Sequence, residues 1–399
     1  MIMNEIKEFG EKIKNEYFMH EPGTAFCNHG SYGAVPKSVF NHQEELRKKC
    51  ESHLNRFIWD EAMPRYKYTI ERVSKFVQCS PETLVLIENV TTGVATVLNH
   101  INVQSNGAIL INSHTYPSVR NAVKLLTEKI GATLISIPIP IPIISENQVL
   151  DVFHNVLKQH KNTKIGLAIA DHISSCSAIQ FPVKKLVRMF DDFNIPVLVD
   201  GAHAPGQVEL ALEDLNADYY VGNFHKWGYA PRGCAILRIH PKYRETLYPL
   251  VISHFYNGDL HDRFHFQGTR DNSAFFSLPN ALDFYNNIGG YEKIIPYNSQ
   301  LVRWAQELIC SELKTKKLDI PSSLEAPCMV CVELPKKLDE NGEVVPGWKI
   351  SLELQEKFRV VAPITEFNQK HWVRLSANVY NTKNDYHKLS DALIQIYRL

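Results

Sequence analysis

Short apolar runs alternate with amphipathic segments through the middle of the chain. Runs typical of buried strands occupy residues 83–87, 107–112, 132–137, 164–170, 196–200, 218–222 and 234–238. Segments with helical spacing of apolar positions lie between the earlier runs, at residues 92–101, 118–130, 149–160 and 183–193. Strands that alternate with helices predict a mostly parallel sheet with helices on both faces, which is an α/β fold.

The last part of the chain has a different pattern. A helix over residues 280–313, interrupted at Gly289-Gly290, precedes strands at residues 326–333 and 372–376, a polar loop at 336–347 and a final helix at 384–397. This order predicts a smaller α+β domain, as expected for 399 residues, which exceed what one core usually holds. Residues 1–18 show amphipathic helical spacing and lack the apolar core of a signal peptide.

Composition excludes several classes of partner. The 43 Lys and Arg residues balance 43 Asp and Glu residues, so a nucleic-acid or anionic-membrane partner is not expected. No run approaches the roughly 20 apolar residues of a membrane span, and the alternating prolines of residues 137–144 predict an extended edge segment. Cys328 and Cys331 lie in a strand-like run without further ligands, so we expect buried thiols, no metal site and a cytoplasmic location.

The most informative residues are a lysine and an aspartate. Asp200 ends the run at residues 196–200, and Lys226 follows the next run, in His225-Lys226-Trp227. This arrangement suits a pyridine-ring aldehyde such as pyridoxal 5'-phosphate, because the lysine forms an imine with the aldehyde and the aspartate pairs with the ring nitrogen. His203 and His225 stand beside these residues and could reach the ring oxygen and the phosphate, although most of the 17 histidines of a chain like this one serve structure.

A phosphate group needs a helix N-terminus, and residues 89–94 supply one. Thr91, Thr92 and Gly93 open a helix directly after a strand, although an ordinary threonine cap would give the same pattern. His114 follows another strand and could stack on a ring, and Tyr116 could act as acid or base; a helix-entry loop with a packed aromatic is the alternative. Arg374 ends an apolar run and suits a substrate carboxylate, or else a structural ion pair.

These motifs together resemble the class V aminotransferase-type, fold-type-I pyridoxal phosphate enzymes. Within them the chain is similar to the branch of isopenicillin N epimerase, hercynylcysteine sulfoxide lyase and cysteine desulfhydrases. The resemblance extends over almost the whole chain. It is carried by residues 28–36, 90–93, 171–175, 200–206, 225–227, 268–271 and 374–381.

The resemblance implies a large domain (residues 31–270) with a seven-stranded, mostly parallel sheet, a small α+β domain (271–399), and an N-terminal segment (1–30) that packs with the small domain. It implies Lys226 as the Schiff-base lysine, Asp200 as the pyridinium partner and Tyr116 as a catalytic tyrosine. It also implies Arg374, Asn28 and Tyr32 as substrate-binding residues. The implied cofactor-binding residues are Thr91, Thr92, Gly93, His114, Ser175, His203, Asn223, His225 and Thr269. Thr269 matches a residue that reaches the phosphate of the neighbouring subunit, which implies a homodimer with shared active sites.

Two departures narrow the reaction. Residues 360–371 contain no cysteine where cysteine desulfurases carry a persulfide-forming one, and Ser174-Ser175 replaces the asparagine that desulfurases place at the ring. We therefore expect a lyase that breaks the C–S bond of cysteine or an S-substituted cysteine, giving pyruvate and ammonia. The alternatives are an amino-acid epimerase, an aminotransferase or a decarboxylase of the same family, and a non-catalytic relative that binds a partner.

Substrate specificity is expected from residues 28–34, 255–266 and 360–371. The histidines of these stretches and their neighbours predict a polar, basic pocket, although the same residues suit a protein surface. The histidines are His254, His261, His265 and His371, and Tyr256 belongs to the same set of pocket residues.

Overall fold

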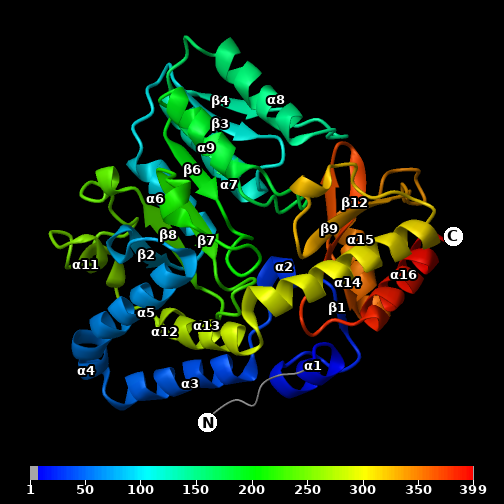
Figure 1. The fold of residues 1–399 in the computed structure, drawn as a ribbon, viewed down its shortest axis with the longest axis horizontal. Coiled ribbons are helices and arrows are strands. Elements are labelled where there is room, and N and C mark those ends of the chain that lie inside the picture. Colours follow the sequence, from blue (N-terminus) through cyan, green and yellow to red (C-terminus); the bar gives the residue numbers. More distant parts are fainter. Residues whose placement is uncertain (1–7, 399) are drawn as a thin grey trace.

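The computed structural model describes residues 8–398, which form a large sheet-centred part and a smaller part (Figure 1). The helix expected over residues 1–18 is α1 (Glu11–Tyr17), and the first seven residues of that expectation lie outside the described part.

Seven strands form the central sheet, and each falls on one of the predicted apolar runs. They are β2 (Leu84–Ile87), β3 (Ala108–Asn112), β4 (Thr133–Ile137), β5 (Ile165–Asp171), β6 (Val197–Asp200), β7 (Tyr219–Asn223) and β8 (Ala235–Ile239). Their order is β2-β8-β7-β6-β5-β3-β4, and only β8 runs antiparallel to its neighbours β2 and β7. The predicted seven-stranded, mostly parallel sheet is confirmed.

Helices cover both faces of this sheet because alternate strand residues point to opposite sides. Val85, Ile109 and Leu167 belong to one apolar cluster, with residues of α6 (Val90–His100) and α7 (Pro117–Ile130). Leu84 and Leu110 belong to another, with residues of α8 (Glu146–Gln159) and α9 (Val183–Asp192). After the edge strand β4, the proline-rich segment buries Ile139 and Ile143 and exposes Ile144.

Further helices surround the large part. They are α2 (His29–Tyr32), α3 (Lys37–Ser52), α4 (Leu54–Arg56), the π-helical turn η1 (Phe57–Glu61), α5 (Ala62–Val77), α10 (Leu212–Leu215), α11 (Leu260–His265), α12 (Ser273–Phe276) and α13 (Leu278–Asn287). Short 3-10 turns lie at η2 (Pro81–Thr83), η3 (Pro241–Tyr243) and η4 (Ser322–Leu324).

The smaller part is built on a three-stranded antiparallel sheet with β12 in the centre. Its strands are β9 (Met329–Leu334), β11 (Ile364–Phe367) and β12 (Lys370–Ser376), and its helices are α14 (Gly290–Glu312), α15 (Gly347–Phe358) and α16 (Lys383–Tyr397). A parallel pair joins β1 (Ala25–Phe26) to β10 (Val360–Val361), so the N-terminal segment packs with this part. A separate apolar cluster runs from Leu301 to Ile396 and includes Ala25. The domain boundary at residues 270 and 271 stays a prediction.

Among residues 8–398, no helix is both long and apolar enough to cross a membrane.

Candidate active site

The lysine lies on a turn between two strands of the central sheet. β7 ends at Asn223 and β8 begins at Ala235, and Lys226 lies in the turn that joins them. Its Nζ is 3.0 Å from Nε2 of His203, and its side chain lines a cavity of about 360 Å³. Burial, followed by the positive charge of Arg374, lowers the pKa of Lys226 to about 7, while Asp200 acts in the opposite direction. A large fraction of this amine is therefore neutral near pH 7.

Two carboxylates face the cavity from adjacent strand ends. Asp171 ends β5 and pairs in register with Asp200, which ends β6. Asp200 accepts one hydrogen bond, from the backbone N–H of Ala202 at 3.0 Å, and burial raises its pKa. Burial and then the charge of Asp200 raise the pKa of Asp171 to about 7. The Asp171 side chain accepts hydrogen bonds from Asn112 at 2.6 Å and Thr115 at 3.0 Å.

The N-terminus of α6 opens onto the same cavity. Asn89 caps this helix by accepting the backbone N–H of Thr92 at 2.8 Å, and Asn223 accepts that of Val90 at 3.0 Å. The backbone N–H of Thr91 has no acceptor among the residues that the structure describes. Since free N–H groups and the helix dipole favour anions, Thr91 marks a site for a phosphate group.

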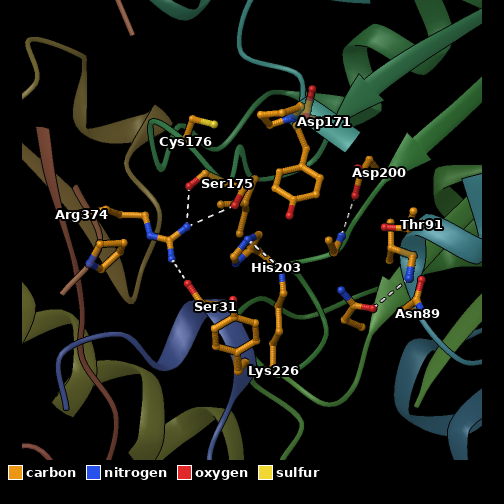
Figure 2. A pocket seen from close by; sticks show the side chains of 18 of the residues that line it. Ser31, Asn89, Thr91, Asp171, Ser175, Cys176, Asp200, His203, Lys226 and Arg374 are labelled. Atoms are coloured by element: carbon orange, nitrogen blue, oxygen red, sulfur yellow. Dashed lines mark hydrogen bonds between the residues drawn. The ribbon is translucent and has the colours of Figure 1, made fainter. Parts of the chain in front are cut away.

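The opposite end of the cavity holds a buried arginine. Arg374 donates through NH1 to the carbonyl and hydroxyl oxygens of Ser175, at 2.6 and 3.2 Å, and through NH2 to Asn28 Oδ1 at 3.0 Å and Ser31 Oγ at 2.7 Å. No carboxylate within the described residues forms an ion pair with it, although its side chain is only 3% exposed. A buried guanidinium without an anion is costly, so this end of the cavity suits the carboxylate of a bound molecule. Figure 2 shows Arg374 across the cavity from Thr91 and Asp200, with Lys226 and His203 between them.

Most of the predicted site residues line this cavity. They are Tyr32, Thr91, Tyr116, Ser175, Asp200, His203, Asn223, His225, Lys226 and Arg374. Tyr32 and Tyr116 stand at its rim, 67% and 41% exposed. His225 lies behind the lysine turn, where its Nδ1 is 2.9 Å from the carbonyl oxygen of Cys234.

Five predicted residues lie outside the cavity lining. Asn28 Oδ1 accepts a hydrogen bond from Arg374, and the backbone N–H of Thr92 donates to the side chain of Asn89, the N-cap residue. Gly93 faces the sheet, where a Cβ would lie 2.5 Å from Ile87 Cδ1. The absence of a side chain at this position therefore lets α6 pack closely on the sheet. The other two are His114 and Thr269.

His114 is buried, and neither ring nitrogen has a hydrogen-bond partner within residues 8–398. Its ring meets the Phe367 ring edge-on, with centroids 5.5 Å apart. Thr269 lines a different cavity of about 450 Å³.

Within the described residues, the histidines expected for a basic pocket lie away from this cavity. None of His254, His261, His265 and His371 lines the cavity. His261 hydrogen-bonds to the carbonyl oxygen of Leu84, and His371 lies 3.4 Å from Glu366 on the smaller part. The stretches at residues 28–34 and 360–371 do reach the cavity, through Ser31, Tyr32, Pro363 and Thr365, whereas residues 255–266 do not.

The structure adds residues to which the sequence assigned no role. Asp171 belongs to a motif of the resemblance, and its position at a strand end was the available signal. Asn89 directly precedes the helix, where asparagine is a common N-cap residue, so its role could also have been predicted from the sequence. Cys176 lines the cavity near Arg374, so a thiol is present although residues 360–371 contain none. Cys328 and Cys331 are buried free thiols, as expected.

These groups fit pyridoxal 5'-phosphate. The unsatisfied N–H at the start of α6 suits its phosphate, the buried amine of Lys226 suits its aldehyde, and the nearly unsatisfied carboxylate of Asp200 suits a protonated ring nitrogen. A buried carboxylate with one hydrogen bond is unfavourable unless a cation joins it. The fold and the site thus define a pyridoxal-phosphate enzyme of the α/β class.

The sequence profile of the family "Aminotransferase class-V" matches residues 36–389, and the chain belongs to this family. The predicted family and cofactor are thereby confirmed. The chain is 28% identical over 410 residues to "Probable L-cysteine desulfhydrase, chloroplastic" of Arabidopsis thaliana, with 97% of this chain and 86% of the relative covered.

Two further relatives represent the other activities of the predicted branch. Over 401 residues the chain is 27% identical to "Hercynylcysteine sulfoxide lyase" of Schizosaccharomyces pombe, covering 98% of each chain. Over 390 residues it is 27% identical to "Isopenicillin N epimerase" of Streptomyces clavuligerus, covering 94% of this chain and 95% of the relative. Among solved structures, a complex of the cystine C–S lyase C-DES with cysteine persulfide shares the fold, with a TM-score of 0.77, 18% identity, and 93% and 97% of the two chains covered.

Proposed function

We propose that this chain is a pyridoxal-phosphate-dependent C–S lyase that acts on cysteine or an S-substituted cysteine. The observation that carries the proposal is the distribution of charged groups in the cavity. The buried Asp200 lies at one end, Arg374 lies at the other without a carboxylate partner among the described residues, and the Lys226 amine lies between them. Relatives named cysteine desulfhydrase and hercynylcysteine sulfoxide lyase support the reaction type.

The chain's own groups would divide the work as follows. When bound, the cofactor accepts the electron pair of a bond that breaks at the substrate Cα. Arg374 binds the substrate carboxylate through two hydrogen bonds and so orients Cα. One comes from Nε–H, which has no partner among the described residues, and the other replaces an NH2 hydrogen bond to Ser31 or Asn28. Lys226 Nζ, neutral near pH 7, takes the proton from Cα. Asp200 stabilises the protonated ring nitrogen, and Thr91 with the α6 N-terminus binds the phosphate.

Release of sulfur needs a proton as well. As the Cβ–S bond breaks, the leaving sulfur takes a proton from Tyr116 Oη or from Lys226 Nζ. The products are a thiol and 2-aminoacrylate, which water converts to pyruvate and ammonia. The rim position of Tyr116 supports its role, because the rim is where a substrate side chain meets solvent.

An assay for pyruvate and thiol tests the proposal. Purified protein is incubated with L-cysteine and with S-substituted cysteines, and Lys226→Ala is the inactive control, in which the visible absorption band of the lysine-bound cofactor disappears. Altered optical rotation without pyruvate would overturn the lyase assignment in favour of an epimerase, the second candidate suggested by the Streptomyces relative. A colourless, cofactor-free protein would indicate a partner-binding role instead.

We also propose that two copies of the chain form a dimer with shared active sites. Large apolar side chains are exposed in two segments: Leu54 and Trp59 in the first, and Leu250, Val251, Ile252 and Tyr256 in the second, each between 43% and 57% exposed. Leu54 lines the Thr269 cavity, and Trp59 packs on Phe266 of its lining. A patch of this kind on a folded chain indicates an interface. Thr269 would then reach the phosphate of the second copy.

Analytical ultracentrifugation tests the dimer. Ile252→Asp should give monomers that lose the cofactor, and a dimeric, cofactor-retaining variant would exclude this surface. Ile144→Asp is a matched control, since Ile144 is 80% exposed on the proline-rich segment. We further propose a cytoplasmic location, which the eight free cysteines support.

A further inference from the structure

A buried histidine contacts the backbone of the lysine turn. His29 is the first residue of α2 and is fully buried. Its Nε2 lies 2.8 Å from the carbonyl oxygen of Lys226, and its Nδ1 lies 2.8 Å from the hydroxyl of Tyr380. Because a carbonyl oxygen only accepts, Nε2 carries the hydrogen, and Nδ1 accepts the hydroxyl proton of Tyr380. Burial lowers the pKa of His29 to about 3, which agrees with a neutral ring.

The backbone next to His29 packs closely on the same turn. Gly33 has a φ of +67°, and a Cβ there would lie 2.2 Å from the carbonyl oxygen of His225 and 2.7 Å from that of Lys226. Gly30 approaches Trp227, which follows the lysine, with a virtual Cβ 3.3 Å from its ring. Residues 28–33, which we name the 28–33 turn, therefore lie directly against the Lys226 peptide.

The 28–33 turn also holds the arginine at the far end of the cavity. Asn28 Oδ1 and Ser31 Oγ accept from NH2 of Arg374, and Ser31 donates to Asn28 at 2.7 Å. One short segment thus contacts both the peptide that carries the amine and the guanidinium that awaits a carboxylate. Tyr380, whose hydroxyl bonds to His29, lies four residues after the end of β12. β12 is the strand that carries Arg374.

We propose that His29 is a positioning residue for Lys226: its Nε2–H holds the Lys226 carbonyl and so sets the position of Nζ relative to Arg374. This inference rests on the proposed role of Lys226. The charged or titratable groups that act on Nζ are Asp200 at the end of β6, His203 after it and Arg374 on β12. His29 touches none of their side chains in the described structure; its effect passes through the lysine backbone.

Three variants separate positioning from packing. His29→Phe keeps a ring in the aromatic cluster but removes both hydrogen bonds, Tyr380→Phe removes only the hydroxyl, and His29→Gln offers an amide N–H to the Lys226 carbonyl. His20→Phe is the matched control, because the His20 ring packs on Tyr380 with centroids 4.3 Å apart. Among the residues that the structure describes, its buried Nε2 has no partner and no contact joins His20 to Lys226.

The readouts are kcat, KM and the pH midpoint of the visible absorption band of the cofactor-loaded chain. His29→Phe should lower kcat about 10- to 100-fold, as expected for a small displacement of a reacting group, and leave KM within about threefold. It should move the band midpoint by about half a pH unit or more, since the environment of Nζ changes. Tyr380→Phe should change kcat and the band midpoint in the same direction but by a smaller amount. His29→Gln should have a kcat and a midpoint close to the wild-type values.

Unchanged kcat and midpoint in His29→Phe, or equal changes in His20→Phe, would overturn the inference. If His29→Phe does not fold, the other two variants decide. A wild-type kcat in Tyr380→Phe together with a large loss of kcat in His29→Gln would then count against the inference. A wild-type chain without a visible band would overturn the proposed function and this inference together. A normal wild-type band with unshifted variants would overturn the inference alone.

Discussion

Replacement of Arg374 by methionine is expected to remove carboxylate binding and leave the remainder of the site intact. Methionine fills similar apolar volume but has no donors. A hydrogen bond to a charged group contributes about 1.5–3 kcal/mol, so the loss of two costs about 3–6 kcal/mol. At 1.4 kcal/mol for each factor of ten, affinity for an amino acid should fall about 10²- to 10⁴-fold.

The assay uses two ligands that differ by the carboxylate and lack a sulfur leaving group. L-Alanine and ethylamine are titrated into the cofactor-loaded protein, and dissociation constants are read from the visible spectrum. Arg374→Met should weaken the binding of L-alanine by about 10²- to 10⁴-fold. It should weaken the binding of ethylamine by less than about threefold, because ethylamine has no carboxylate to form these hydrogen bonds. Equal weakening of the two ligands would refute the assignment of Arg374 to the carboxylate.

Stability should change little in this variant. Removal of a buried charge without an anionic partner offsets the loss of its hydrogen bonds, and the Ser31–Asn28 hydrogen bond at 2.7 Å remains. We expect a thermal midpoint within about 3 °C of the wild-type value. Arg303→Met is the matched control, since Arg303 is paired with Glu325 at 2.7 Å, and it should leave both dissociation constants unchanged.

Three further outcomes are expected. The rate at which apoprotein takes up pyridoxal phosphate should fall as pH drops below about 7, the pKa of Lys226, because the protonated amine does not attack an aldehyde; a flat profile in stopped-flow absorbance would contradict this. Tyr116→Phe should lower kcat for pyruvate release about 10²-fold with cofactor binding unchanged; an unchanged kcat would exclude Tyr116 as the acid and assign the proton to Lys226. Gly33→Ala should lower the thermal midpoint more than Gly342→Ala, which shares a positive φ (+79° against +67°) but would meet no atom within 4 Å.

The sequence predicted the central sheet well because its strands are short apolar runs bounded by polar turns. All seven strands begin and end within one residue of the expected ranges, and Gly289-Gly290 marks the break between α13 and α14. Local patterns did not reveal the pairing of β1 with β10, whose residues are more than 300 positions apart. Nor did they reveal α15, which begins at the end of the polar loop.

The site was predictable where a motif joins a residue type to a strand end, and not elsewhere. Lys226, Asp200 and Thr91 follow strands whose ends meet at one edge of the sheet, so the sequence brings them together. Cys176 and Thr365 reach the cavity through folding of separate segments, for which no local pattern exists. The histidines near residue 260 suited a pocket and a surface equally, because polarity alone does not indicate which surface a side chain faces, and in the described chain they lie away from the cavity.

The two ends of the cavity are held in place by different kinds of contact. The lysine turn joins β7 and β8, and both strands are hydrogen-bonded on each side within the sheet. Amide protons of these strands should therefore exchange with solvent only through global unfolding. Arg374 lies on β12, which is also paired on both sides, but its guanidinium is held by Ser175 of the loop after β5 and by the 28–33 turn. Changes in the loop after β5 can thus alter substrate preference while the sheet and the 28–33 turn hold the lysine in place.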